Sequence, residues 1–186
     1  MESDSKEERF KPSHLSKVFA FCPKCGSEGL AFNGEKVLSC KVCGLEYYMN
    51  PAPAVAAILQ FPDGRIVLAH RKHEPRKGML DLPGGFVDMN ERVEDAVKRE
   101  IFEELAVKVD MMEFIGSFPN EYVFKGVSYF TCDMAFVCKI AGDTMLNAAD
   151  DIMDALVIRP EDINFDEICF PSIVSILKLY CEKFLK

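Results

Sequence analysis

The 186-residue chain contains no tryptophan, only three histidines, and fewer basic than acidic residues. Its 22 Lys and Arg against 30 Asp and Glu give a formal net charge of −8. Such a balance argues against broad electrostatic binding of DNA or RNA, which needs a basic surface. We therefore expect no nucleic-acid partner. A small phosphorylated ligand remains compatible with this charge, because a bound metal ion can invert the local field.

The chain also lacks an apolar run of transmembrane length, so no membrane partner is expected. Its first nine residues are mostly charged and contain no secretory hydrophobic region. These absences predict a cytoplasmic protein with a flexible N-terminal tail over residues 1–19. Hydrophobic residues make up 49% of the sequence, which is enough to bury the core of one medium-sized domain beside a small appendage.

Four of the eight cysteines form two C-x2-C pairs, namely Cys22 with Cys25 and Cys40 with Cys43. A glycine follows each pair and allows the tight backbone turn around a metal ion. The spacing resembles a zinc ribbon, predicted here over residues 20–50. Its Zn²⁺ would be structural, because four thiolates leave no open position for chemistry. A rubredoxin-type iron site uses the same ligands, and disulfides are disfavoured in a reducing compartment.

A helix is predicted over residues 93–105, because apolar side chains recur there at every fourth position. Glu100, Glu103 and Glu104 lie in the same segment and fan over an arc of roughly 100° that begins inside the apolar stripe. Buried, clustered carboxylates need a cation among them, and oxygen ligands suit Mg²⁺ or Mn²⁺. The alternative is a solvated acidic helix face stabilised by i,i+4 ion pairs.

This helix follows a loop with the sequence Leu82-Pro83-Gly84-Gly85. The motif that joins them reads Gly85-x5-Glu91-x7-Arg99-Glu100-Ile101-Phe102-Glu103-Glu104. It resembles the Nudix box, the signature of hydrolases that cut nucleoside diphosphates linked to another moiety.

The resemblance implies a role for each charged residue of the motif. Glu100, Glu103 and Glu104 would be catalytic metal ligands for Mg²⁺ or Mn²⁺. Arg99 would orient these carboxylates, with Glu91 as its salt-bridge partner. The family usually has glycine at the position of Ala106, where the helix ends in a left-handed conformation that costs alanine about 1 kcal/mol.

Strands are predicted over residues 54–60, 65–70, 112–117, 127–139 and 155–158, with a hairpin turn at Asp63-Gly64. An amphipathic helix is predicted over 171–185. The alternation of strands with two substantial helices implies an α/β class with a mixed sheet between helices. Nudix proteins have this α/β/α sandwich, which is expected here over residues 51–186, preceded by the zinc ribbon.

Substrate contacts are predicted at three places. Arg71 and Arg76 belong to a basic loop before the glycines and could clamp a diphosphate, although an ordinary solvated loop is the alternative. Gly84 and Gly85 would let the backbone approach the metal or phosphate without side-chain obstruction. Phe118 and Tyr122 could stack on adenine or simply pack against the protein.

A four-cysteine ribbon before a Nudix domain is the layout of NADH pyrophosphatases and of certain FAD or ADP-ribose pyrophosphatases. The NADH-cleaving group carries a Ser-Gln-Pro-Trp-Pro-Phe-Pro-type array after the box. The present chain instead reads Ser117-Phe118-Pro119-Asn120, which argues against NADH as the main substrate.

The resemblance therefore implies metal-dependent hydrolysis of the diphosphate linkage in ADP-ribose, FAD or a related dinucleotide, with release of a mononucleotide. A nucleoside triphosphate or dinucleoside polyphosphate hydrolase is one alternative, and a non-catalytic nucleotide sensor is another. A homodimer is plausible by family analogy.

Overall fold

The computed structural model describes residues 10–184, so the first nine residues of the predicted tail lie outside the described part. The chain divides into two compact units. One contains the described residues as far as Pro51 together with Glu121–Phe130, and the other contains Ala52–Asn120 and the described residues from Thr131 onward. Within residues 10–184, none of the helices has the length and apolar character that crossing a lipid bilayer requires.

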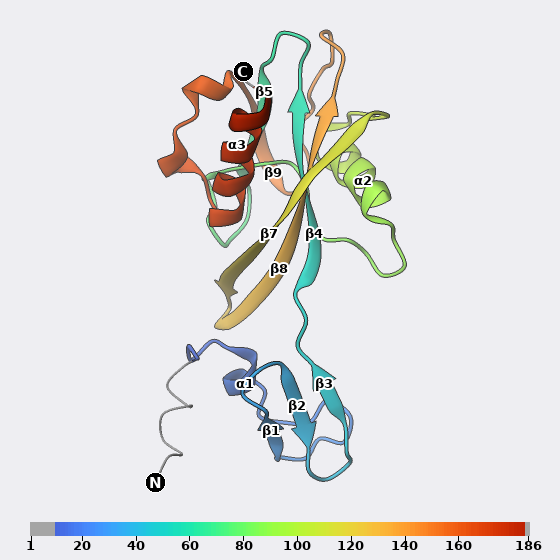
Figure 1. The fold of residues 1–186 in the computed structure, drawn as a ribbon, viewed down its shortest axis with the longest axis vertical. Coiled ribbons are helices and arrows are strands. Elements are labelled where there is room, and N and C mark those ends of the chain that lie inside the picture. The colour runs from blue at the N-terminus through green and yellow to red at the C-terminus, as the bar shows by residue number, and fades with distance from the viewer. Residues whose placement is uncertain (1–9, 185–186) are drawn as a thin grey trace. The chain divides into compact units, whose positions relative to one another are not determined.

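The first unit contains a three-stranded antiparallel sheet in the order β1–β2–β3 (Figure 1). Its elements are α1 (Leu15–Val18), β1 (Leu30–Phe32), β2 (Val37–Cys40) and β3 (Glu46–Tyr48). Gly26 and Gly44 have positive φ angles of 72° and 70°. The two glycines that follow the cysteine pairs therefore adopt the left-handed turns expected of them.

Residues 10–19 were predicted as part of a flexible tail, but they include α1 and several contacts inside the first unit. The Phe10 and His14 rings lie 4.4 Å apart, and the Ser128 amide donates to the Ser13 carbonyl at 2.7 Å. The boundary between tail and ribbon at residue 20 stays a prediction. The first unit also includes residues 121–130, which lie outside the range of 20–50 predicted for the ribbon.

The second unit is built on a six-stranded mixed sheet in the order β6–β5–β4–β8–β7, with β9 also paired to β5. The strands of the sheet are β4 (Ala52–Gln60), β5 (Ile66–Arg71), β6 (Leu80–Asp81), β7 (Met112–Phe124), β8 (Val127–Lys139) and β9 (Ile152–Ile158). The last residues of β7 and the first of β8 fall within Glu121–Phe130 and so belong to the first unit. The helices of the second unit are α2 (Val93–Leu105), η2 (Pro160–Asp162), η3 (Phe165–Glu167) and α3 (Pro171–Phe184). The β4–β8 pair is parallel, and β5 pairs antiparallel with β4, β6 and β9.

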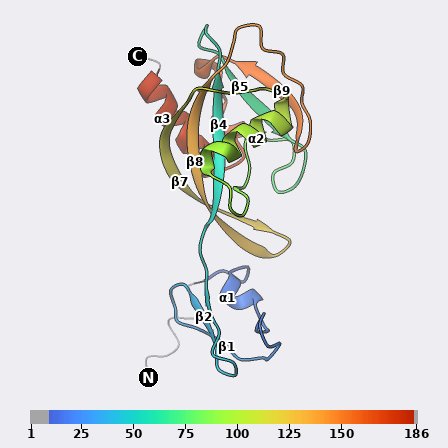
Figure 2. The same cartoon turned by 90° about the vertical axis from the view of Figure 1, so that its right-hand side faces the viewer.

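The two long helices, α2 and α3, lie on opposite faces of this sheet (Figures 1 and 2). Side chains alternate between the faces of a strand, so Val55, Ala57 and Leu59 of β4 join the core that α2 also lines. On the other face, the Gln60 amide donates to the Tyr180 hydroxyl of α3 at 2.8 Å. Because both faces are covered, β4 reads as a continuous apolar run. The α/β class and the α/β/α sandwich are confirmed.

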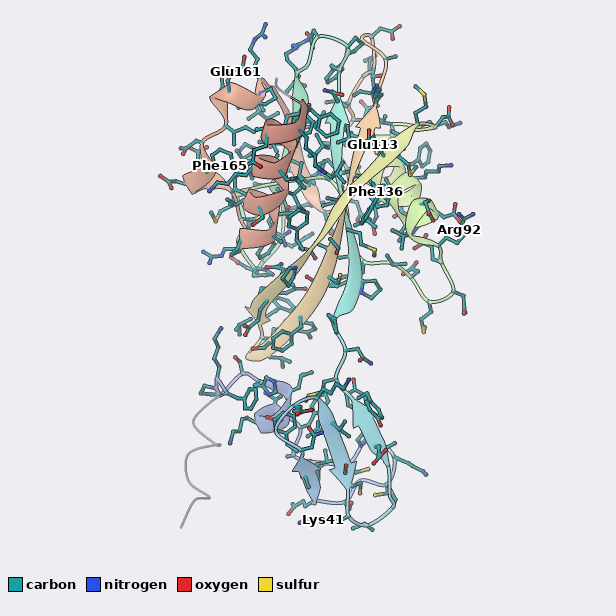
Figure 3. All side chains as sticks on the ribbon, in the orientation of Figure 1. Lys41, Arg92, Glu113, Phe136, Glu161 and Phe165 are labelled. Atoms are coloured by element: carbon teal, nitrogen blue, oxygen red, sulfur yellow. The ribbon has the colours of Figure 1, made fainter. Side chains whose placement is uncertain are left out.

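Strand β7 is longer than the sequence indicated. The prediction ended it at residue 117, but the strand continues through Pro119 to Phe124. Proline is tolerated because β7 is an edge strand, where one side of the backbone needs no ladder partner. The side chain of Phe136 (Figure 3) belongs to the α2-facing core, and its ring lies 5.5 Å from that of Phe114 of β7.

Candidate active site and metal centre

Helix α2 has the bounds that its apolar repeat predicted. It follows Arg92 (Figure 3) and ends at Leu105, and it is capped by Ala106, whose φ of 56° and ψ of 26° are left-handed. The buried stripe consists of Ala96, Val97, Ile101, Glu104 and Leu105. Glu104 is only 4% exposed, so one carboxylate lies inside the apolar face, as the helical geometry predicted.

The glycine loop runs alongside the first half of β4. The Val55 amide donates to the Gly85 carbonyl and the Ala57 amide to the Pro83 carbonyl, each at 2.8 Å. Gly84 has a φ of 146°, and a Cβ there would collide with the Val55 carbonyl oxygen. A Cβ on Gly85 would lie 2.5 Å from Glu100 Oε1. Gly84 is therefore required by the close approach of the β4 backbone, whereas a side chain at Gly85 would displace the Glu100 carboxylate.

Arg99 joins the carboxylates of the motif. Its Nε and Nη2 each donate to Glu91 at 2.8 Å, a bidentate pair. Its Nη1 donates to Glu100 Oε1 at 2.8 Å and to Glu103 Oε2 at 3.1 Å, and Nη2 also donates to the Phe86 carbonyl at 3.0 Å. The predicted Arg99–Glu91 ion pair is present. The Arg99 hydrogen bonds lower the pKa of Glu91 to about 2.

Among the described residues 10–184, Glu104 has no cationic partner of this kind. Its Oε2 accepts a hydrogen bond from the Gly84 amide at 2.9 Å. Burial raises the pKa of Glu104 to about 8, and the charges of Glu100, Asp81 and Asp151 add to this effect. Burial also raises the pKa of Glu100. A buried carboxylate surrounded by other carboxylates is stabilised by a cation.

These residues fit a divalent cation in donor type, charge and burial, because hard oxygen ligands are those that Mg²⁺ and Mn²⁺ prefer. In the part of the chain that the structure describes, the four cysteine sulfurs form the sole tight group of ligand atoms, within 4.8 Å of one another. The α2 carboxylates are spaced more widely, and Arg99 bridges Glu100 and Glu103.

Two acidic residues beside Glu104 were missed by the sequence analysis. Asp81 immediately precedes the glycine loop, and Asp151 follows a segment in which the Ala149 amide donates to the Glu104 carbonyl at 2.8 Å. Proximity to the glycine loop could have singled out Asp81. Nothing in the sequence marks Asp151, because its approach to α2 is purely tertiary.

Of the two arginines predicted in the basic loop, Arg71 is the last residue of β5 and only Arg76 lies in the loop itself. Arg71 Nη1 donates to Asp81 Oδ2 at 2.7 Å, and its Nε donates to the Pro75 carbonyl at 2.9 Å. Arg76 is exposed and has a positive φ of 67°. The guanidinium of Arg71 is therefore already engaged by a carboxylate of the protein, whereas that of Arg76 faces solvent.

Of the two aromatic side chains predicted to stack on adenine, Phe118 is not brought together with the glutamates. A Cβ on Gly116 would contact both Phe118 and Leu179 of α3, so Phe118 lies on the face of β7 opposite α2. Tyr122 belongs to the other compact unit, where its ring stacks on Tyr129 at 5.6 Å.

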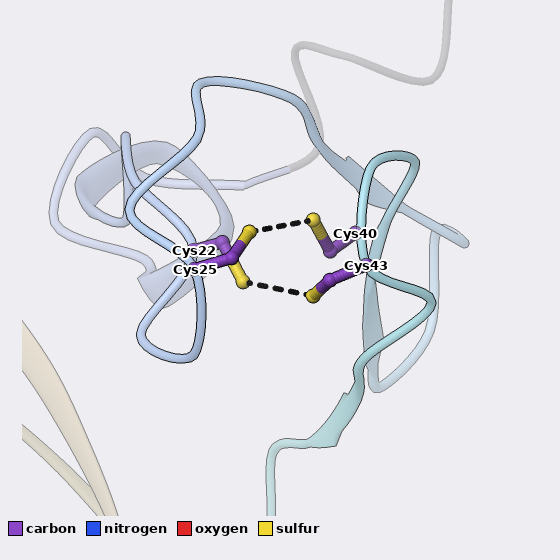
Figure 4. Close-up of side chains that lie close together, drawn as sticks. All are labelled: Cys22, Cys25, Cys40 and Cys43. Carbon is purple, nitrogen blue, oxygen red and sulfur yellow. Dashed lines mark hydrogen bonds between the residues drawn. The ribbon is translucent and has the colours of Figure 1, made fainter.

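The four cysteines of the predicted ribbon converge from two turns (Figure 4). The Sγ atoms of Cys22 and Cys43, and those of Cys25 and Cys40, lie 3.7 Å apart. A tetrahedron with Zn–S bonds near 2.3 Å has edges of about 3.8 Å, whereas a disulfide needs about 2.05 Å. The arrangement is compatible with a four-thiolate metal site and excludes a disulfide at these separations.

Comparison with known proteins agrees with the motif and the fold. The family model described as NUDIX domain matches residues 50–172. This range is well over half of the chain, so the chain belongs to the NUDIX family, as the Gly85–Glu104 motif predicted.

Individual relatives are more distant. An "NAD-capped RNA hydrolase NudC" of Haemophilus influenzae (strain PittGG) is 30% identical over 113 residues, which are 58% of this chain and 43% of that protein. A protein of the same name from Vibrio atlanticus is 28% identical over 143 residues, covering 76% of this chain and 50% of that protein. The chain thus spans half or less of the length of these curated relatives.

A solved structure resembles a larger share of the chain. The crystal structure of a NUDIX hydrolase from Nitrosomonas europaea has a TM-score of 0.67 and 25% sequence identity, covering 89% of this chain and 92% of that one. This likeness agrees with the α/β/α sandwich described above.

Proposed function

We propose that this protein is a pyrophosphohydrolase that cleaves the diphosphate linkage of ADP-ribose, FAD or a related dinucleotide and releases a mononucleotide. The observation that carries the proposal is the convergence of Glu100 and Glu104 on the Gly84-Gly85 loop, with Glu104 buried and in need of a cation. Family membership supports the same reaction class.

The roles of the residues follow from their contacts. Glu100, Glu103 and Glu104 would hold Mg²⁺ or Mn²⁺. When bound, this ion would neutralise phosphate oxygens and lower the pKa of a coordinated water. Arg99 orients Glu100 and Glu103 through hydrogen bonds, while Glu91 fixes Arg99. The absence of side chains at Gly84 and Gly85 lets the β4 backbone and the Glu100 carboxylate lie against the loop. The exposed Arg76 of the basic loop is the candidate for a contact with the diphosphate.

The metal of the first unit is proposed to be Zn²⁺ in a structural role, held by Cys22, Cys25, Cys40 and Cys43. Iron of the rubredoxin type would use the same four thiolates. Metal analysis of the purified protein distinguishes the two ions directly.

The substrate is the open part of the proposal. The relatives named NAD-capped RNA hydrolases point to a dinucleotide joined to RNA, whereas the net charge of −8 favours a free small molecule. The absence of a Ser-Gln-Pro-Trp-Pro-Phe-Pro-type array favours ADP-ribose or FAD over NADH. Triphosphate or dinucleoside polyphosphate hydrolysis and nucleotide sensing remain the alternatives.

Product analysis by chromatography tests the proposal. The purified protein would be incubated with Mg²⁺ or Mn²⁺ and with ADP-ribose, FAD, NADH, an NAD-capped RNA oligonucleotide, diadenosine polyphosphates and nucleoside triphosphates. AMP from ADP-ribose or FAD is expected. Turnover of the capped RNA in preference to free dinucleotides would reassign the substrate, and turnover of triphosphates alone would favour the first alternative. No product from any compound would favour a sensor.

A further inference from the structure

A half-buried ion pair holds the start of the glycine loop. Asp81 is the last residue of β6 and directly precedes the Leu82–Gly85 loop. Its Oδ2 accepts from Arg71 Nη1 at 2.7 Å, and its Oδ1 accepts from the Leu82 amide at 2.8 Å. The Asp81 and Arg71 side chains are 13% and 24% exposed. One carboxylate therefore connects strand β5 with the first residue of the loop.

Arg71 also connects the start of the glycine loop, through Asp81, to two further segments of the chain. Its Nε donates to the Pro75 carbonyl at 2.9 Å, and its guanidinium lies 5.0 Å from the ring centroid of Phe170, just before α3. The guanidinium thus contacts the basic loop, β6 and the turn into α3 at once. A planar, multidentate group of this kind fixes geometry better than a flexible lysine would.

The position of the loop determines where two backbone amides lie. Gly84 is only three residues beyond Asp81, and its amide donates to Glu104 Oε2 at 2.9 Å. Consecutive Cα atoms are held about 3.8 Å apart, so a shift at Leu82 moves Gly84 as well. The loop start and the buried carboxylate of α2 are therefore mechanically coupled through a short, tightly hydrogen-bonded segment.

A contribution to stability does not by itself explain why Arg71 and Asp81 are paired here, because apolar side chains can often replace a buried ion pair without loss of stability. Outer residues that orient metal ligands, in contrast, typically change metal affinity or activity 10–100-fold when removed.

We propose that Arg71 and Asp81 are positioning residues for the metal-binding glutamates. They fix the Leu82–Gly85 loop so that the Gly84 amide orients Glu104 and the loop lies against Glu100. The effect on turnover rests on the proposed function, but the effect on metal affinity does not require turnover. This role replaces the diphosphate clamp predicted for Arg71 and leaves Arg76 as the candidate for that contact.

The test uses Arg71→Met, Asp81→Leu and the double variant, with Arg65→Met as matched control. Arg65 forms an exposed pair with Asp63 at 2.7 Å at the other end of the β5 hairpin. Mn²⁺ affinity is measured from the electron paramagnetic resonance signal of free Mn²⁺, together with kcat, KM and the melting temperature. The double variant is included because the single variants leave one charge buried and unpaired.

We expect each single variant to lose Mn²⁺ affinity and kcat by roughly 10–100-fold, with little change in KM and no effect in the control. The double variant should regain the melting temperature but not the Mn²⁺ affinity. Recovery of both would make the pair merely structural and overturn the proposal. A raised KM for Arg71→Met with normal Mn²⁺ affinity would restore the diphosphate clamp. If the variants lose Mn²⁺ affinity but the wild-type protein turns over no substrate, the positioning role is supported and the proposed function is refuted. If the wild-type protein binds no Mn²⁺, both proposals are refuted.

Discussion

Replacing Glu104 by glutamine removes a buried ionisable carboxyl group while keeping the size of the side chain and an oxygen that can accept the Gly84 hydrogen bond. We expect this change to abolish most turnover and, in the absence of divalent cations, to make the protein more stable. The two effects have the same cause, because the charge that would hold the metal is unfavourable without it.

The magnitude follows from the pKa of Glu104, which burial raises from 4.5 to about 8. Below about pH 4.5 the carboxyl is protonated in both the folded and unfolded chain, and no stability is lost. As the pH rises toward 8, the unfolded chain releases this proton and the folded protein keeps it. The free energy of unfolding then falls by about 1.4 kcal/mol per pH unit. Above about pH 8 the loss levels off, with roughly 5 kcal/mol as an upper bound.

Urea unfolding followed by circular dichroism measures this difference for wild type and Glu104→Gln between about pH 5 and pH 9. Zinc is retained and no other divalent cation is added. Glu94→Gln, an exposed change on the same helix, serves as control. The gap between variant and wild type should widen with pH and narrow when Mg²⁺ is added, because Mg²⁺ stabilises only the wild type. A pH-independent gap, or full activity in a folded Glu104→Gln protein, would refute the reasoning.

Three further predictions concern the ribbon, the end of α2 and the glycine loop. Cys25→Ser should lower the zinc content and the melting temperature more than it lowers kcat, because structural zinc contributes folding energy. Metal analysis checks this, with Cys132→Ser as the control variant, and an unchanged zinc content would contradict it. Ala106→Gly should raise the free energy of unfolding by about 1 kcal/mol at unchanged kcat, because it relieves a left-handed alanine; a loss of stability in urea unfolding would contradict it. Gly84→Ala should inactivate the enzyme and destabilise the loop, because its Cβ would meet the Val55 carbonyl; normal activity and melting would show that the loop adapts.

Local patterns were enough to predict several elements. The bounds of α2 were correct because the apolar repeat begins at Val93 and the helix cannot continue regularly past the left-handed Ala106. The convergence of the cysteines was predictable because each C-x2-C turn is local and only two such turns had to meet. Strand β7 was cut short because Pro119 is a local breaker signal, which the edge position of the strand overrides.

The sequence by itself determined the family, the α/β class and the glutamates and arginine of the Gly85–Glu104 motif, because these follow from short-range spacing. Only the tertiary structure decided which charges meet. Arg71 pairs with Asp81, and Asp151 approaches Glu104, across separations that no local pattern encodes. The face on which Phe118 lies depends on the pleat and on the packing of α3, not on its distance from the motif in the chain. The pKa of each carboxyl group likewise depends on its burial, and burial is a property of the assembled core.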